Sequence, residues 1–463
     1  MTASAELIDL LAGIVGSDHV LVDADVTARY RVDWTRRFHC GPVPVVRPES
    51  TDEVCKLVSL ANAFRFPVVP QGGNTGLVGG GIPVSAQGVV LSTERLLEVG
   101  EIDALSAQII VGAGVILGDL QRRLRGSGFM FGVDLGARDS CTIGGMVATN
   151  AGGINVLRYG TMRRQVVGIE AVLGDGTVVS HLTGLEKDNT GYDLEGLLAG
   201  SEGTLGVITR VLLRLFPEPK SVATAFLSFD GVAEAVEGAS LLKRTLSSLE
   251  ALEFMLEPGL RLVERVHGFT FPRSTIPKAV LLVEASGAAA VVDDLGSACS
   301  QLSSLLSAEP AVAVGPTGRA ALWRWREEHT ASIATLGVPL KLDVSLPPRS
   351  IAEFLIELDS LSSPSPAIVF GHLGDGNLHV NFPACFPSSP TELVPAWAHV
   401  LEHDVLQLVT NHGGSISAEH GIGVAKVPYL SMTRSAGEIA AFRNIKRACD
   451  PNHVLNPGVL LAD

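Results

Sequence analysis

Residues 71–81 read QGGNTGLVGGG, and six of these eleven residues are glycine. They follow the apolar segment 67–70, PVVP, which the pattern predicts as a strand. Glycine allows positive φ and close approach of the backbone to a ligand. Consecutive N–H groups in such a loop form a concavity for anions. No Gly-Lys-Ser/Thr follows, and residues 112–117, GAGVIL, lack the third glycine of the Rossmann pattern. The stretch therefore predicts a loop that holds a diphosphate in another way.

A second run of small residues, 142–153, reads TIGGMVATNAGG. Two such loops in one domain suggest one extended ligand lying between them. Before the first loop, segment 41–48 resembles a strand and residues 51–65 carry apolar side chains at helical spacing. This β-α-β order predicts an α/β layer.

A break in the pattern at residues 217–220, PEPK, indicates a domain boundary. Beyond it strands and helices mix, which predicts an α+β fold for the chain, with an antiparallel sheet in the second domain. We expect residues 1–219 to form the ligand-binding domain and 220–425 a substrate and metal domain. Residues 426–463 should be a helical segment that returns to the first domain.

Composition limits the function classes. The 463 residues carry a net charge of −14, which disfavours nucleic acid as a partner and requires a local positive site for any anionic substrate. The start of the chain resembles no secretory signal, and no long apolar run predicts a membrane span. Six scattered cysteines are typical of a reduced protein, so we expect a cytoplasmic location.

A motif with two histidines predicts a metal site. Residues 370–382 read FGHLGDGNLHVNF, and Asp-Gly between two β-like runs predicts a two-residue turn. With Asp375 and Gly376 at that turn, His372 would lie opposite His379, with Asn381 on the same face as His379. Two imidazoles at that separation suit one divalent metal. A surface hairpin with two unrelated histidines is the alternative.

A carboxylate beside a histidine supplies the remaining groups. Residues 416–423 read ISAEHGIG, where Glu419 can complete a His-His-carboxylate set. His420 would then lie near the metal without binding it, which suits a general base. Solvent-exposed polarity is the alternative explanation for the pair.

Basic side chains suggest where an anionic substrate would bind. Arg326 and Thr330 are four apart in a helical pattern and should share a face. Lys341 stands in an alternating strand pattern, 341–346. An Arg fork and a Lys charge suit a carboxylate.

The glycine-rich loops resemble those of a known superfamily. Residues 71–81, 142–153 and 203–208 (GTLGVI), with the closing 456–458 (NPG), look like the PCMH-type FAD-binding domain of the vanillyl-alcohol-oxidase superfamily. Some relatives attach FAD to a histidine in the first loop. Asn74 occupies that position here, so the resemblance implies non-covalent FAD. The implied flavin contacts are Pro70, Gln71, Gly72, Gly73, Asn74, Thr75, Gly76, Leu77, Ser140, Thr142, Gly144, Gly145, Asn150, Gly152, Gly153, Ile208 and Asn456.

The two histidine motifs resemble those of FAD-linked D-2-hydroxy acid dehydrogenases. That resemblance implies zinc or manganese on His372, His379 and Glu419, with His420 as the catalytic base. It also implies substrate contacts from the side chains of Arg326, Thr330, Lys341, Asn381 and His420. Lys341 favours D-2-hydroxyglutarate over D-lactate or glycolate, which remain the alternatives.

Two further classes remain as rivals. A flavin electron-transfer subunit without catalysis would need neither metal nor base. An alkyl-transferring flavoenzyme would be expected to lack the paired histidines. No motif identifies the electron acceptor, for which an electron-transfer flavoprotein or a quinone is considered, and a homodimer is the family-level expectation.

Overall fold

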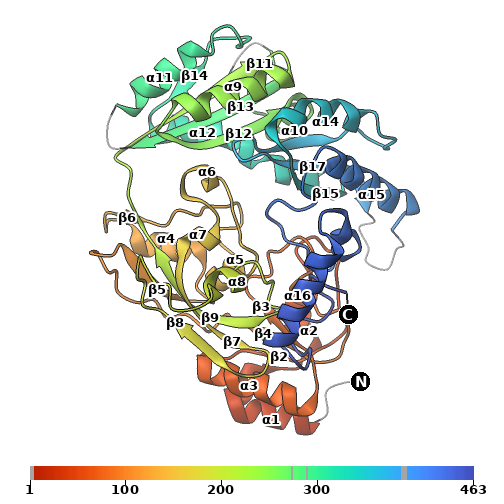
Figure 1. The fold of residues 1–463 in the computed structure, drawn as a ribbon. Coiled ribbons are helices and arrows are strands. Elements are labelled where there is room, and N and C mark those ends of the chain that lie inside the picture. Colours follow the sequence, from red (N-terminus) through yellow and green to blue (C-terminus); the bar gives the residue numbers. More distant parts are fainter. Residues whose placement is uncertain (1–4, 273–274, 288–289, 387–393, 463) are drawn as a thin grey trace. The chain divides into compact units, whose positions relative to one another are not determined.

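A computed structural model describes residues 5–272, 275–287, 290–386 and 394–462. These residues form two compact units, which are described separately (Figure 1). The first comprises Met1–Gly153, Gly160–Pro217 and Glu419–Asp463. The second comprises Ile154–Tyr159 and Glu218–Ala418. The expected three-part division of the chain stays a prediction.

The first unit contains a four-stranded sheet built on the predicted β-α-β segment. Its order is β1 (Val20–Leu21), β2 (Val45–Val46), β4 (Val89–Ser92) and β3 (Val68–Gln71), with β4 parallel to both β2 and β3. Helix α3 (Thr51–Phe64) begins after Ser50, whose hydroxyl accepts a hydrogen bond from the Glu53 N–H. Its buried Leu57 and Val58 pack in a core that also contains Val68. The sheet therefore places the start of the glycine-rich loop directly after β3.

A second, antiparallel sheet completes this unit. Its order is β5 (Gln108–Gly112), β9 (Gly206–Arg214), β7 (Val166–Leu173) and β8 (Val178–His181). Short strands β6 (Phe129–Met130) and β10 (Phe216–Pro217) pair separately. Ile143 and Met146 of the short helix α5 (Ile143–Ala148) lie in the core with Ile208 of β9. This packing fixes the second small-residue loop.

The C-terminal segment packs within the first unit. Helix α16 (Ala436–Cys449), drawn blue in Figure 1, begins with a capping box between Ser435 and Glu438. After it, the Val68 N–H donates to the Val454 carbonyl at 2.7 Å, and the Asn456 N–H donates to the Val68 carbonyl at 2.9 Å. Residues 454–456 thus extend the sheet beside β3. Further α-helices of the unit are α1 (Ala5–Val15), α2 (Ala24–Thr27), α4 (Leu117–Leu124), α7 (Met162–Gln165) and α8 (Leu194–Leu198).

The second unit is built on a seven-stranded antiparallel sheet. In order, its strands are β14 (Ala311–Ala313), β11 (Ser221–Phe229), β13 (Ala279–Gly287), β12 (Leu249–Leu256), β16 (Ile368–His372), β17 (Asn377–Phe386) and β15 (Val338–Ser345). The mixed architecture of the two units confirms the predicted α+β class.

Helices cover both faces of the seven-stranded sheet. On one face, Leu260 of α10 and Trp323 of α12 pack with Phe370 of β16. On the other face, Gly238 of α9 lies against Phe229 of β11. The bounds are α6 (Val156–Tyr159), α9 (Val232–Thr245), α10 (Glu257–His267), α11 (Val291–Gln301), α12 (Pro316–Glu327), α13 (His329–Ala334), α14 (Ile351–Asp359) and α15 (Ala396–Asn411). Among the residues that the structure describes, no helix is long and apolar enough to cross a membrane.

The hairpin between β16 and β17 corrects the predicted register. His372 pairs with Asn377 and Phe370 pairs with His379, so the loop has four residues, 373–376, rather than two. A two-residue type I′ turn requires positive φ at both central residues, and of Asp375 and Gly376 only Gly376 has it, at 81°. His372 is consequently a diagonal neighbour of His379 on the same face, not its direct cross-strand partner.

The helix predicted around Arg326 is also interrupted. Helix α12 ends at Glu327 and α13 begins at His329, so Arg326 and Thr330 lie on two different helices.

Candidate active site

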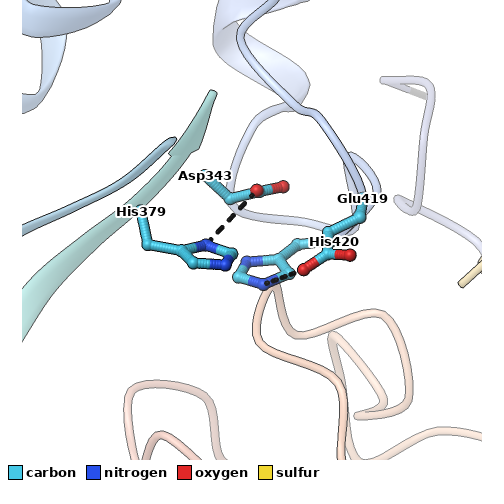
Figure 2. A group of neighbouring side chains, drawn as sticks. All are labelled: Asp343, His379, Glu419 and His420. Atoms are coloured by element: carbon cyan, nitrogen blue, oxygen red, sulfur yellow. Dashed lines mark ion pairs between the residues drawn. The ribbon is translucent and has the colours of Figure 1, made fainter. Parts of the chain in front are cut away.

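Four donor side chains come together at the end of the seven-stranded sheet. Each of Asp343, His379, Glu419 and His420 offers one ligand atom, and these atoms all lie within 4.8 Å of one another. Figure 2 shows the four side chains pointing toward a common centre. Two imidazoles and two carboxylates are a donor set that zinc or manganese accepts. The residues present therefore fit a divalent metal.

Strand register brings the first two donors together. Asp343 of β15 pairs with His379 of β17, so their side chains share a face of the sheet. Asp343 is fully buried, and its Oδ1 lies 3.6 Å from His379 Nδ1. The same Oδ1 accepts a hydrogen bond from Asn377 Nδ2 at 2.6 Å. Asp343 is thus held rigidly beside the Nδ1 edge of the imidazole.

Glu419 and His420 are positioned beside Asp343 by the segment that precedes them. They directly follow Ala418, whose N–H donates to Asp343 Oδ2 at 3.1 Å. Glu419 Oε2 accepts a hydrogen bond from the Gly153 N–H at 3.1 Å, and Glu419 Oε1 lies 3.9 Å from His420 Nε2 (Figure 2).

A buried glutamate fixes the residues that follow. Glu202 accepts hydrogen bonds from the N–H groups of Ile422 at 2.8 Å and Gly423 at 2.7 Å. Burial raises the pKa of Glu202, while these N–H groups and the charge of Lys426 oppose the rise. The loop after His420 is therefore anchored by a carboxylate far away in sequence.

His372 lies next to this group rather than within it. Its ring centroid is 5.3 Å from that of His379, and the two rings are nearly perpendicular. Its Nδ1 bonds to Glu253 Oε1 at 2.7 Å. Burial alone would raise the pKa of Glu253, but the charges of His372 and Arg326 bring it below its ordinary value. A role for His372 as a metal ligand stays a prediction.

The residues predicted to bind a carboxylate all belong to the second unit. Arg326 is buried, and its Nε donates to Glu253 Oε2 at 2.6 Å. Thr330 is half-buried on α13, a helix that packs on β15 and β17. Lys341 pairs in register with Asn381, which places both on the face of Asp343 and His379. Burial lowers the pKa of Lys341 to about 8.

The predicted flavin contacts all lie in the first unit, where two glycine-rich segments pack closely. A Cβ on Gly73 would lie 1.9 Å from the Ser140 carbonyl oxygen, and one on Gly72 would lie 2.2 Å from Thr142 Oγ1. Only glycine permits this approach. The residues at 72–73 and 140–142 thus form neighbouring walls, as expected for an extended ligand.

Four residues in or beside the predicted flavin-binding segments have an unusual backbone geometry. Asn74, Asn150, Glu202 and Asn456 all have positive φ, which is uncommon outside glycine. The Asn456 side chain donates to the carbonyls of Gly80 and Glu202, while its Oδ1 is buried without a partner. A flavin carries a ring N–H that can satisfy such an acceptor. The residues present therefore fit a flavin.

Sequence reasoning missed two carboxylates in the second unit, Asp343 and Glu253. Asp343 occupies an alternating position two residues after Lys341, which was a usable signal. Glu253 interrupts the apolar run of β12, and a charge inside a buried strand requires a partner.

Two family models match the chain. Residues 42–181 match the FAD binding domain, and residues 218–460 match the C-terminal domain of the FAD linked oxidases. The second match alone covers more than half of the chain.

Curated relatives match over most of their length. The D-2-hydroxyglutarate dehydrogenase of Bos taurus is 38% identical over 96% of this chain and 81% of that protein. The one from Xanthomonas citri is 38% identical over 93% of this chain and 92% of that protein. A putative D-lactate dehydrogenase of Schizosaccharomyces pombe is 33% identical over 98% of this chain and 90% of that protein.

Solved structures share the fold. An alkyldihydroxyacetonephosphate synthase superposes with a TM-score of 0.76 at 19% identity, over 98% of this chain and 85% of that one. A p-cresol methylhydroxylase superposes with a TM-score of 0.76 at 16% sequence identity, over 99% of this chain and 97% of that one. These likenesses confirm the PCMH-type fold that the glycine-rich loops predicted.

The expected cytoplasmic location is wrong in the light of the relatives. The relatives from Bos taurus and Schizosaccharomyces pombe are named mitochondrial, and sparse cysteine does not distinguish the cytoplasm from that compartment. The two matched domains and the identity to full-length dehydrogenases agree with each other. The chain therefore belongs to the FAD-linked oxidase family and is an FAD-dependent oxidoreductase.

Proposed function

We propose that this protein oxidises D-2-hydroxyglutarate to 2-oxoglutarate with non-covalent FAD and one divalent metal, zinc or manganese. The substrate assignment rests on Lys341, a half-buried cation on the sheet face that also holds Asp343 and His379. A dicarboxylate substrate offers a second anion for such a cation. Relatives named D-2-hydroxyglutarate dehydrogenase support the same substrate.

The proposal assigns a role to each group. His372, His379 and Glu419 would hold the metal, and Arg326, Thr330, Lys341 and Asn381 would hold and orient the substrate. His420 would take the proton from the 2-hydroxyl group as a hydride leaves C2. When bound, the flavin supplies the hydride acceptor and the metal supplies Lewis acidity at the hydroxyl.

The glycine-rich segments of the first unit would bind FAD without a covalent bond, because Asn74 stands where a linking histidine would be expected. The reduced flavin must then pass its electrons on. We propose an electron-transfer flavoprotein or a quinone as acceptor and a homodimer as the assembly, on the family resemblance.

A second candidate is a D-lactate dehydrogenase. The Schizosaccharomyces pombe relative, which bears that name, supports it. D-lactate has no second carboxylate, so this reading leaves Lys341 without a function in substrate binding.

The test is anaerobic reduction of the bound flavin. The purified yellow protein is mixed with D-2-hydroxyglutarate, L-2-hydroxyglutarate, D-lactate or glycolate, and the flavin absorbance is followed. We expect rapid bleaching by D-2-hydroxyglutarate alone, and its loss after a chelator. Bleaching only by D-lactate or glycolate would show that D-2-hydroxyglutarate is not the substrate. Full activity after complete metal removal would show that the reaction needs no metal.

A further inference from the structure

Glu253 is a charged residue inside a strand of buried residues. It lies between Leu252 and Phe254 in β12, and its side chain is 1% exposed. Removing an ionised carboxylate from water is strongly unfavourable unless hydrogen bonds and opposite charges compensate. Its position therefore calls for partners that use both oxygens.

Those partners belong to the two halves of the proposed site. Phe254 pairs with Gly371, so Glu253 stands beside His372 in the next strand. Its Oε1 bonds to His372 Nδ1 at 2.7 Å, and its Oε2 accepts from Arg326 Nε at 2.6 Å. The guanidinium also lies over the Phe370 ring, with Cζ 4.6 Å from the centroid. One carboxylate thus holds two side chains from different elements, β16 and α12.

The bond to His372 determines which ring nitrogen is available. An ionised Glu253 accepts a proton donor at Nδ1, so the lone pair of the neutral imidazole is at Nε2. Carboxylates hydrogen-bonded to the far nitrogen of a metal-binding histidine fix its tautomer and orientation in this way. Asp343 stands beside Nδ1 of His379 in a looser version of the same arrangement, at 3.6 Å.

The bond to Arg326 fixes the guanidinium. With Nε on Glu253 and the planar group against Phe370, the two Nη groups have a set direction. A preset fork loses little conformational entropy when it binds a carboxylate.

We propose that Glu253 is a positioning residue that sets His372 for metal binding and Arg326 for substrate binding, and so couples the two. The proposal rests on the proposed function. It goes beyond it by giving a buried residue outside the ligand set control over both metal affinity and substrate KM.

Glu253→Gln is the informative change, because both partners donate to this carboxylate. A glutamine offers one acceptor and one donor, so it satisfies one partner only. If its amide N–H faces His372, the imidazole proton moves to Nε2 and blocks the metal. If the amide N–H faces Arg326, it meets the Arg326 Nε–H, and two donors then oppose each other.

The experiment measures Zn²⁺ affinity of the FAD-loaded full chain by competition with a chromophoric chelator, and then KM and kcat for D-2-hydroxyglutarate. We expect Glu253→Gln to weaken Zn²⁺ binding about 10- to 100-fold and to raise KM, with the flavin spectrum unchanged. Glu250→Gln is the matched control, because Glu250 is a buried glutamate of the same strand that contacts Ser286 and Arg158. It should keep wild-type Zn²⁺ affinity.

A double-mutant cycle with His372→Ala tests whether Glu253 acts on the metal through His372. In that background Glu253→Gln should change Zn²⁺ affinity no further, because its effect passes through His372. Wild-type Zn²⁺ affinity in Glu253→Gln overturns the proposal, as does an additive loss in the double variant. If Glu253→Gln fails to fold, Glu253→Asp is the substitute. It keeps the negative charge for Arg326, but its shorter side chain moves the carboxylate oxygen away from His372, so Zn²⁺ affinity should still fall. Wild-type protein that needs no metal would instead refute the proposed function.

Discussion

His420 is the residue on which the chemistry of the proposed reaction depends most. Its Nε2 lies 3.9 Å from Glu419 Oε1, within the four-donor group (Figure 2). A positioned general base typically contributes about 10²- to 10⁴-fold to the rate. We expect His420→Ala to lower kcat by a factor in that range, measured by stopped-flow flavin reduction, while FAD content and Zn²⁺ affinity are retained.

The matched control is His403→Ala, since His403 is an exposed histidine on α15. It should leave turnover unchanged. Near-normal kcat in His420→Ala would exclude the role as base, and a large loss of Zn²⁺ affinity would make His420 a ligand instead.

We expect Lys341 to give the substrate preference a pH dependence. Burial lowers its pKa to about 8, so the side chain is a cation below that pH and becomes neutral above it. The attraction for a distal carboxylate is lost with the charge. We therefore expect kcat/KM for D-2-hydroxyglutarate to fall above about pH 8, while kcat/KM for D-lactate does not show this step.

Lys341→Arg provides the check, because arginine stays charged throughout this range. It should move the fall to higher pH, and Lys341→Met should raise KM for D-2-hydroxyglutarate about 10- to 100-fold, as expected for losing a charged hydrogen bond. Identical pH profiles for wild type and Lys341→Met would exclude Lys341 from the substrate contacts.

At the scale of elements, the β16–β17 hairpin determines how His372 and His379 face each other. Its four-residue loop ends in Gly376, with φ at 81°. A Cβ there would lie 2.5 Å from the Leu346 carbonyl oxygen, which belongs to the segment after β15. The loop therefore also fixes the hairpin against the strand that carries Lys341 and Asp343.

Gly376→Ala should disturb this junction. It combines a left-handed backbone, which costs roughly 1 kcal/mol for alanine, with a clash against backbone that cannot move cheaply. We expect a lower Tm and weaker Zn²⁺ binding. Gly126→Ala is the control, because Gly126 also has positive φ but nothing lies within 4 Å of its Cβ position. Equal Zn²⁺ affinity in both variants would mean that the loop does not set the site.

At the scale of the whole molecule, we expect flavin binding to depend on close approach between segments far apart in sequence. The clearest case is Gly73 against the Ser140 carbonyl oxygen, at 1.9 Å from a built Cβ. Gly73→Ala must separate these two backbones. We expect purified Gly73→Ala to contain less than a tenth of the wild-type FAD, measured by absorbance after denaturation.

Gly13→Ala serves for comparison, since nothing lies within 4 Å of its Cβ position in α1. It should retain its FAD. Full FAD content in Gly73→Ala would show that the flavin does not lie in the space formed by these two segments.

Much of this protein can be read from its sequence, because the decisive signals are local. The glycines at 72–73 and 144–145, the helix at 51–64 and the pairing of Glu419 with His420 are properties of short segments. The flavin fold and the oxidoreductase class followed from the resemblance of such segments to known families, and the family matches confirmed both.

Tertiary structure alone decided the rest. The hairpin register depended on whether Asp375 adopts positive φ, which neighbouring strands determine. The roles of Asp343 and Glu253 required knowing which residues stand beside them in adjacent strands, β17 and β16. The sequence shows that Glu253 interrupts an apolar segment, but it does not show which side chains lie beside it. Only the sheet shows that it is buried between His372 and Arg326, because pairing between distant strands is a non-local property of the fold.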